Sequence, residues 1–209
     1  MFDSRAQFRE AGFDVIERQD KPGGHVTIMV GTHPSLPDKV FKRYPNTKDL
    51  DYQKSNYKKR VEGVERIGEF IEDRRLMRLL MPRKWMVRLP DEFGSRRRSG
   101  YIIVADKLDI VGNKDTCEQY RRIDNELLAQ LCVLLWAFPN FDANPSNIPF
   151  TKDGRIAFVD TESWNRKRKK EEEPRHRYRY LLRYLKDHLS DNQYDRAKDM
   201  LKRFARYEG

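Results

Sequence analysis

The segment 141–164 constrains this chain more than any other part of its sequence. It reads F-D-A-N-P-S-N-I-P-F-T-K-D-G-R-I-A-F-V-D-T-E-S-W, which places two aspartates and an asparagine at fixed intervals. Asp142 comes first, Asn147 follows five residues later, and Asp160 ends the series. Pro145 fixes one φ angle between the first two, so it stiffens the loop that carries them.

Two short apolar runs, 148–150 and 156–159, lie between Asn147 and Asp160. The five residues that separate the runs have Asp153-Gly154 at their centre, which is typical of a tight β-hairpin. We therefore expect a two-stranded ribbon that carries Asp160 back beside Asn147. The alternative interpretation is a surface Asx-turn followed by a hairpin, without chemistry.

The three side chains together suit phosphoryl transfer. This reaction needs little covalent help from the protein, so catalysis is mostly positioning and neutralisation of charge. Mg²⁺ prefers hard oxygen ligands and usually takes one or two carboxylates together with phosphate oxygens. One carboxylate beside the nucleophile, with one carboxylate and one amide oxygen for the metal, is a minimal sufficient set.

The beginning of the chain predicts an antiparallel meander. Three β-like runs, 13–18, 25–30 and 39–44, are separated by short segments rich in glycine and proline, 19–24 and 31–37. Gly23 and Gly24 lie in the first turn, where the lack of a Cβ lets backbone N–H groups approach a phosphate. Lys42 lies on the third run. A plain hairpin loop and an exposed strand lysine are the alternatives.

Helices and strands alternate in the rest of the chain. Apolar residues at helical spacing predict a helix from about Asp49 to Leu80, ended by Pro82, and a second helix over 115–138. Between them, 84–89 and 101–105 read as strands, joined by a charged turn over 90–100. Two further helices are predicted, one over 174–189 and one that follows Asp191 as its N-cap.

This order of parts resembles the protein kinases and kinase-like phosphotransferases. The resemblance covers most of the chain and implies an α+β, two-lobed protein-kinase-like fold. The amino lobe, 1–105, would hold the antiparallel sheet and one long helix. The reduced helical lobe, 106–209, would hold the catalytic loop and the metal-binding segment.

The resemblance also implies roles for individual residues. Asp142 would act as the catalytic base, Asn147 and Asp160 would hold Mg²⁺, and the ligand would be ATP. The groups that would bind the nucleotide are the Gly23-Gly24 turn, Lys42 on the phosphates, Glu62 or Glu65 as the partner of Lys42, and the backbone of Ala105 and Lys107 at the adenine edge. The sequence does not choose between Glu62 and Glu65, and either reads equally as a solvent-facing charge.

Departures from the family pattern bear on the substrate. The family's H-R-D is Asn140-Phe141-Asp142 here, so the arginine that senses phosphorylation is absent, and only 45 residues follow Trp164. These features imply a stripped-down, constitutively active kinase of protein Ser/Thr hydroxyls, similar to compact kinases that some bacteria inject into host cells. Asp160-Thr161-Glu162 in place of D-F-G looks more like kinases of sugars, aminoglycosides or lipid headgroups, which is the alternative.

Composition sets outer limits. The net charge of +10, with basic runs at 96–98, 166–170 and 175–179, keeps a nucleic-acid-binding module as a second alternative. No apolar run approaches the roughly 18 residues of a membrane helix, and the start of the chain has no signal-peptide pattern. Cys117 and Cys132 form no disulfide framework. We expect a soluble monomer, cytoplasmic or secreted into a host without a Sec-type signal, whose partner is a protein substrate.

Overall fold

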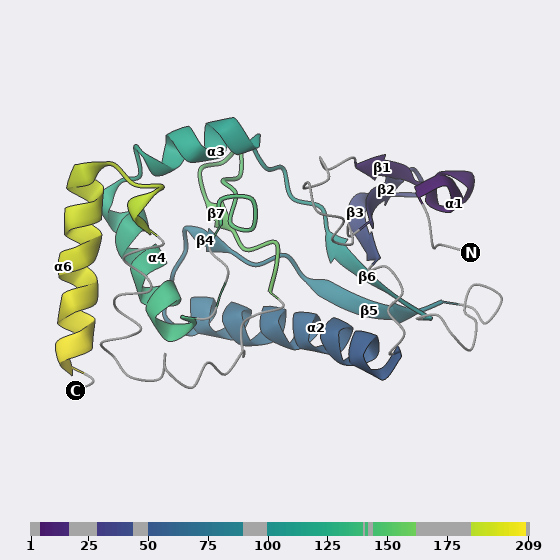
Figure 1. Ribbon diagram of the computed structural model, residues 1–209, viewed down its shortest axis with the longest axis horizontal. Helices are drawn as coiled ribbons and strands as arrows, with labels where there is room; N and C mark the ends of the chain where they lie inside the picture. Colours follow the sequence, from purple (N-terminus) through teal and green to yellow (C-terminus); the bar gives the residue numbers. More distant parts are fainter. Residues whose placement is uncertain are drawn as a thin grey trace. The chain divides into compact units, whose positions relative to one another are not determined.

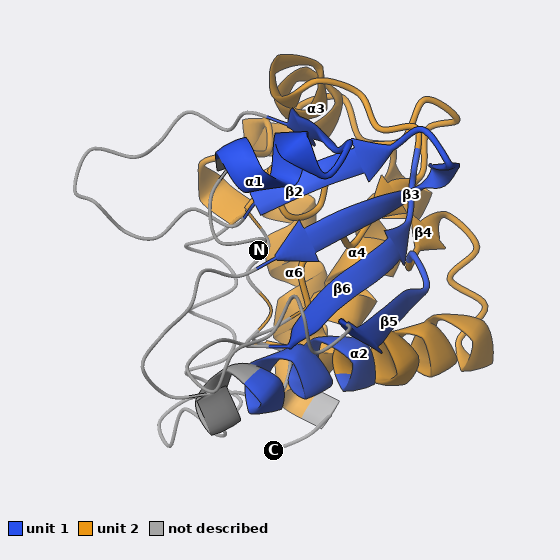
Figure 2. Cartoon of the chain, turned by 90° about the vertical axis from the view of Figure 1, so that its right-hand side faces the viewer, with its two compact units in different colours: residues 1–62, 82–108 blue, residues 63–81, 109–209 orange. Residues whose placement is uncertain are grey.

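The computed structural model describes residues 5–16, 29–43, 50–89, 100–139, 141, 144–161 and 185–207. The chain divides into two compact units, which Figure 2 shows in blue and orange. Unit 1 contains residues 1–62 and 82–108, and unit 2 contains 63–81 and 109–209. Sequence analysis predicted a single boundary between two lobes, after residue 105. In the structure unit 1 ends at Leu108, and 63–81 belong to unit 2.

Unit 1 is built on a five-stranded antiparallel sheet (Figure 1). In spatial order its strands are β1 (Asp14–Ile16), β2 (Met29–His33), β3 (Leu36–Arg43), β6 (Tyr101–Asp106) and β5 (Lys84–Arg88). The first three form the predicted meander, and β5 and β6 lie at the two later predicted strands. The predicted α+β class, with a small antiparallel sheet and helices elsewhere, is confirmed.

Gly31 lies inside β2, so the prediction that it opens a turn over 31–37 was wrong. The turn consists only of Pro34 and Ser35, because β2 continues to His33 and β3 starts at Leu36. A Cβ on Gly31 would come within 2.9 Å of the Phe8 ring and 3.1 Å of the Asp14 carbonyl oxygen. Glycine is therefore required by close packing with a helix that the sequence analysis did not predict, α1 (Arg5–Glu10).

A small aromatic cluster forms the core beneath α1. Phe8 is fully buried and packs with Phe41 and Ile102 from the sheet. The ring of Phe13 stacks on Phe8 at 4.2 Å between centroids and meets Phe41 edge-on at 5.0 Å. Aromatic pairs in these geometries contribute more than their buried area alone.

The long helix α2 runs from Leu50 to Asp73, and it ends well before Pro82. The prediction that proline stops this helix was wrong, because a Schellman motif ends it. Arg75 adopts the left-handed φ of 52°, its N–H bonds the Glu72 carbonyl oxygen, and the Leu76 N–H bonds that of Ile71. Leu76 and Ile71 are both buried in the core of unit 2, which holds this turn in place.

The region predicted as one helix over 115–138 forms two helices, α3 (Asn113–Tyr120) and α4 (Asn125–Ala137). The break has a local cause. The carboxylate of Asp124 accepts a hydrogen bond from the Leu127 N–H at 2.9 Å, which caps α4. Its second oxygen pairs with the Arg78 guanidinium at 2.5 Å. These hydrogen bonds, led by that from Leu127, lower the pKa of Asp124 below its ordinary value.

Helix α6 (Asp191–Tyr207) lies alongside α4 in unit 2 (Figure 1). Asp191 begins the helix, but the capping contact belongs to its neighbours, so the predicted N-cap was wrong by one residue. The Ser190 N–H donates to Gln193 Oε1 at 3.1 Å, which is the return half of a capping box. Gln193 also donates to the Ile123 carbonyl oxygen at 2.6 Å, which fastens α6 to the α3–α4 turn.

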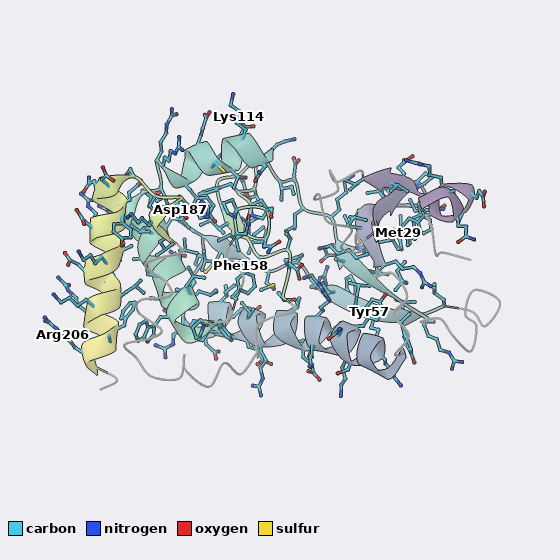
Figure 3. The ribbon with its side chains drawn as sticks, viewed as in Figure 1. Met29, Tyr57, Lys114, Phe158, Asp187 and Arg206 are labelled. Carbon is cyan, nitrogen blue, oxygen red and sulfur yellow. The ribbon has the colours of Figure 1, made fainter. Side chains whose placement is uncertain are left out.

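The core of unit 2 is formed mainly by α4 and by the elements packed against it. Its fully buried members include Leu128, Leu131, Ala197, Leu201 and Phe158, the last of which is labelled in Figure 3. Cys132 also belongs to this core, and burial raises the pKa of its thiol to about 12. Within the described residues, no helix combines the length and the apolar character that crossing a membrane would require.

Replacing Asp124 with alanine removes the cap of α4 and the partner of Arg78. We expect the free energy of unfolding to fall by about 1–2 kcal/mol, as measured by urea titration at pH 7. Asp124→Ser keeps a capping oxygen without the charge, so it should stay within about 0.5 kcal/mol of the wild type. Equal losses in the two variants would show that the ion pair, and not the cap, stabilises this junction.

Candidate functional site

The loop that carries Asn147 begins with a tight Asx-turn. The side-chain oxygen of Asn144 accepts hydrogen bonds from the N–H and the hydroxyl of Ser146, both at 3.1 Å. The Asn144 carbonyl oxygen accepts from the N–H of Asn147 at 2.7 Å and of Ile148 at 3.0 Å. The Asx-turn of the alternative interpretation is therefore present, and it presents Asn147 at the start of the ribbon.

The predicted ribbon is confirmed. Phe150 and Ile156 form an antiparallel bridge, and the Ala157 N–H donates to the Pro149 carbonyl oxygen at 2.9 Å. At the open end the Val159 N–H donates to the Asn147 carbonyl oxygen, also at 2.9 Å. Because Asp160 follows Val159 directly, this bond holds the backbone next to Asp160 against Asn147.

The second arm of the ribbon is held on both sides. It contains β7 (Ile156–Ala157), which pairs in parallel with β4 (Leu79–Leu80). The Phe158 N–H donates to the Leu80 carbonyl oxygen at 2.9 Å, while its neighbours bond to the first arm. The Phe158 ring meets the buried ring of Phe141 edge-on at 5.1 Å. The residues that lead to Asp160 are therefore fixed by backbone bonds and by packing.

The closed end of the ribbon is a tight corner at Gly154, whose φ is 81°. The buried hydroxyl of Thr151 bonds the Asp153 carboxylate and the Arg155 carbonyl oxygen. The Arg155 guanidinium also pairs with Asp153 at 2.7 Å. Hydrogen bonds from Arg155 and Thr151 lower the pKa of Asp153 to about 2. Asp153 is therefore a structural carboxylate that shapes the corner.

Lys42 lies on β3, opposite Val30 of β2 and Ile103 of β6. Side chains alternate between the two faces of a sheet, so Lys42 shares its face with these two buried residues and with Val40. The role of Lys42 on the phosphates stays a prediction.

The two candidate partners of Lys42 differ in their surroundings. Glu62 is partly buried and belongs to unit 1 with Lys42, whereas Glu65 is exposed and belongs to unit 2. Glu62 forms an ion pair with Lys58 one helical turn earlier, at 3.6 Å. Glu62, the less exposed of the two, is thus the better candidate partner of Lys42, although it already pairs with Lys58.

The predicted adenine-binding segment, Ala105 to Lys107, is hydrogen-bonded to the strands of the sheet. Ala105 is buried inside β6, where it pairs with Val40 and Lys84. The Lys107 N–H donates to the Asp38 carbonyl oxygen at 2.8 Å. An adenine ring that uses this N–H would therefore have to displace an existing hydrogen bond.

Asp106, between them, is held by two cations. Its carboxylate bonds Lys39 Nζ at 3.0 Å and Arg83 Nε at 2.9 Å. Both cations also lie over the Trp85 ring, at 5.6 and 5.8 Å from its centre. Burial alone would raise the pKa of Asp106, but the hydrogen bonds from Arg83 and Lys39 outweigh it and lower that pKa. Sequence analysis predicted an adenine contact on either side of Asp106, but not this cluster.

Three predicted site residues, Gly23, Gly24 and Asp142, lie outside the described residues. Among the described ones, no three or more His, Cys, Asp or Glu side chains are grouped so as to hold a metal. Mg²⁺ usually takes one or two carboxylates and completes its shell with phosphate oxygens and water. The prediction that Asn147 and Asp160 would supply hard oxygens to such a shell therefore stays a prediction.

Unit 2 also contains a cleft of about 380 Å³ at the α3–α4 junction. Its floor is apolar, with Ile123, Leu127 and Phe150, and its rim carries charges of both signs. Of the predicted site residues that the structure describes, none lines it. The cleft is therefore separate from the candidate metal site.

One contact to the loop was missed by the sequence analysis. Tyr120 lies within the helix predicted over 115–138, and its buried hydroxyl donates to the Ile148 carbonyl oxygen at 2.7 Å. A buried tyrosine needs a hydrogen-bond partner, so the residue type was a signal. The sequence did not show where the partner lies.

Comparisons with known proteins assign no family to this chain. No protein-family model matches the chain, and no curated protein matches it. Solved structures that match include a MAP kinase of Leishmania major, with 15% sequence identity and a TM-score of 0.36. The match covers 77% of this chain and 49% of the kinase, so the chain spans about half the length of that protein. At this TM-score and identity the likeness supports no conclusion about the fold or the activity of this chain.

Asp106→Asn should lower the free energy of unfolding at pH 7 by on the order of 1 kcal/mol. Because the folded pKa is lowered, the stabilisation is complete above the unfolded carboxyl pKa of about 3.9 and is lost as the pH falls through the folded value. Urea titrations at pH 7, 5 and 3.5 should show the difference from wild type shrinking at the lowest pH.

Asp109→Asn is the matched control, since it removes the exposed pair with Lys152, whose side chains are 73% and 67% exposed. It should change stability by less than about 0.5 kcal/mol. A loss in Asp106→Asn that does not depend on pH would contradict the role of the charge.

Proposed function

We propose that this chain is an ATP- and Mg²⁺-dependent phosphotransferase of the protein-kinase-like kind. The observation that supports it most is the hydrogen bond from the Val159 N–H to the Asn147 carbonyl oxygen. It joins the backbone of Asn147, which bears an amide, to that of Val159, the residue directly before Asp160, at the open end of a ribbon. The ribbon itself follows a meander, a long helix and two further strands, in the order that the sequence pattern predicts.

In this proposal the metal-binding side chains are Asn147 and Asp160. Bound Mg²⁺ would supply neutralisation of the phosphate charge. Asp142, five residues before Asn147, would orient the attacking hydroxyl and accept its proton. Lys42 would contact the α- and β-phosphates from its sheet face, with Glu62 as its partner. The Gly23-Gly24 turn would cover the phosphates, and the backbone near Ala105 and Lys107 would contact adenine.

We further propose that the acceptor is a Ser or Thr hydroxyl of a protein and that the enzyme is constitutively active. Phe141 stands where the family has its phosphate-sensing arginine, and it is only 2% exposed, with its ring against Phe158. A buried aromatic residue at this position has no means of binding a phosphorylated loop. A kinase that needs no such activation suits a bacterial effector that acts on host proteins.

One observation favours a different acceptor. Thr161, which occupies the place of the family's D-F-G phenylalanine, is fully buried, and the motif reads Asp160-Thr161-Glu162. This form looks more like that of small-molecule kinases, so a sugar, an aminoglycoside or a lipid headgroup is the second candidate acceptor.

Nucleotide binding tests the proposal first. A ligand that binds only the folded state stabilises it by about 2.7 kcal/mol at 100 times its Kd, so ATP with Mg²⁺ should raise Tm by roughly 5–10 °C. Asp160→Ala should lose most of this shift, while Asp199→Ala, which removes an exposed carboxylate of α6, should keep it. A full shift in Asp160→Ala would contradict the metal assignment.

Labelling identifies the acceptor. Incubation with γ-labelled ATP and a cell lysate should transfer label to protein, and Asp142→Ala should reduce the transfer by at least about a hundredfold. Label found in small solutes instead would favour the second candidate. Undiminished transfer by Asp142→Ala would refute the base assignment. Salt-sensitive binding to duplex DNA without any response to ATP would instead indicate a basic binding module.

A further inference from the structure

The short helix α3 buries only two of its side chains, Thr116 and Tyr120. They lie one helical turn apart, so they share a face. The hydroxyl group of each residue forms a hydrogen bond with the backbone of the segment that follows Asn147. The Tyr120 hydroxyl donates to the Ile148 carbonyl oxygen at 2.7 Å, and Thr116 Oγ1 accepts from the Phe150 N–H at 3.4 Å.

Successive peptide groups around Asn147 are therefore held by hydrogen bonds. Its N–H donates to Asn144, its carbonyl oxygen accepts from Val159, and the next carbonyl oxygen along the chain accepts from Tyr120. Tyr120 is the one side chain among these three partners. Its contribution can therefore be removed by substitution without changing the course of the backbone.

Tyr120 is suited to a permanent contact. It is 2% exposed, and its ring meets Phe150 edge-on at 5.0 Å. Burial, with a smaller effect from Cys117, raises the pKa of its hydroxyl well above the ordinary value. The hydroxyl thus keeps its proton and remains a donor throughout the neutral range.

We propose that Tyr120 is a positioning residue for the Mg²⁺ site. It holds the Asn147 backbone in the conformation in which the Asn147 side-chain oxygen can coordinate the metal. This inference rests on the proposed function. Mg²⁺ demands near-ideal octahedral geometry at about 2.0–2.1 Å, so small displacements of a ligand weaken binding. Loss of an outer partner of a metal ligand typically costs about 10- to 100-fold in metal affinity.

The test compares Tyr120→Phe, which keeps the ring and removes the hydroxyl, with Tyr194→Phe, which removes a hydroxyl from α6 in the same unit. The first measurement is amide hydrogen exchange without any ligand. Tyr120→Phe should exchange several-fold faster at Ile148 and Val159, and Tyr194→Phe should match the wild type. The second is the Mg²⁺ concentration that gives half of the Tm shift caused by a non-hydrolysable ATP analogue. It should rise about tenfold in Tyr120→Phe alone.

The possible outcomes distinguish a positioning role of Tyr120 from a merely structural one. A merely structural hydroxyl would lower Tm without ligand but leave the Mg²⁺ midpoint unchanged, and that result would overturn the proposal. Unchanged exchange at Ile148 and Val159 would also overturn it. Should Tyr120→Phe fail to fold, Thr116→Val gives the same two measurements, with a smaller expected rise in the midpoint, and no rise would count against the proposal. A wild type without any Mg²⁺-dependent shift would refute the proposed function itself, before any variant is compared.

Discussion

The candidate site depends on one backbone hydrogen bond, from the Val159 N–H to the Asn147 carbonyl oxygen. It closes the open end of the ribbon, and further contacts hold the two arms in place. The Gly154 corner sets the register of the two arms, and β4 holds the second arm from its other side. A metal site with only two protein ligands needs such support, because the ligands themselves supply no cage.

The segment that passes from unit 1 to unit 2 is attached at each of its ends. In unit 1, Asp106 bonds Lys39 and Arg83. In unit 2, Asp109 bonds Lys152 through both its carboxylate and its carbonyl oxygen. Since Lys152 lies in the corner of the ribbon, the start of unit 2 is tied to the same ribbon that carries the candidate metal ligands. Leu108, between the two attachments, is the last residue of unit 1.

The aspartates of the chain differ in their bonding partners. Asp106, Asp124 and Asp153 each pair with an arginine at the end of a strand, the start of a helix or a turn, and each has a lowered pKa. Such carboxylates stabilise the fold, and the net charge of +10 leaves cations available for them. Residue type alone does not separate these structural carboxylates from Asp142 and Asp160. What distinguishes the latter in the sequence is their spacing around Asn147 and the ribbon.

Local patterns in the sequence predict the α+β class, the meander, the two later strands and the ribbon, because hydrophobic periodicity and an Asp-Gly turn act over a few residues. The candidate ligands are also predictable from the sequence, since their residue types and spacing are local. The ends of several elements depend instead on tertiary contacts: Gly31 stays in a strand because Phe8 packs against it, and α2 ends where Leu76 is buried in the core. The partner of the Tyr120 hydroxyl lies 28 residues away along the chain. Contacts of this kind join distant segments, and no local pattern encodes them.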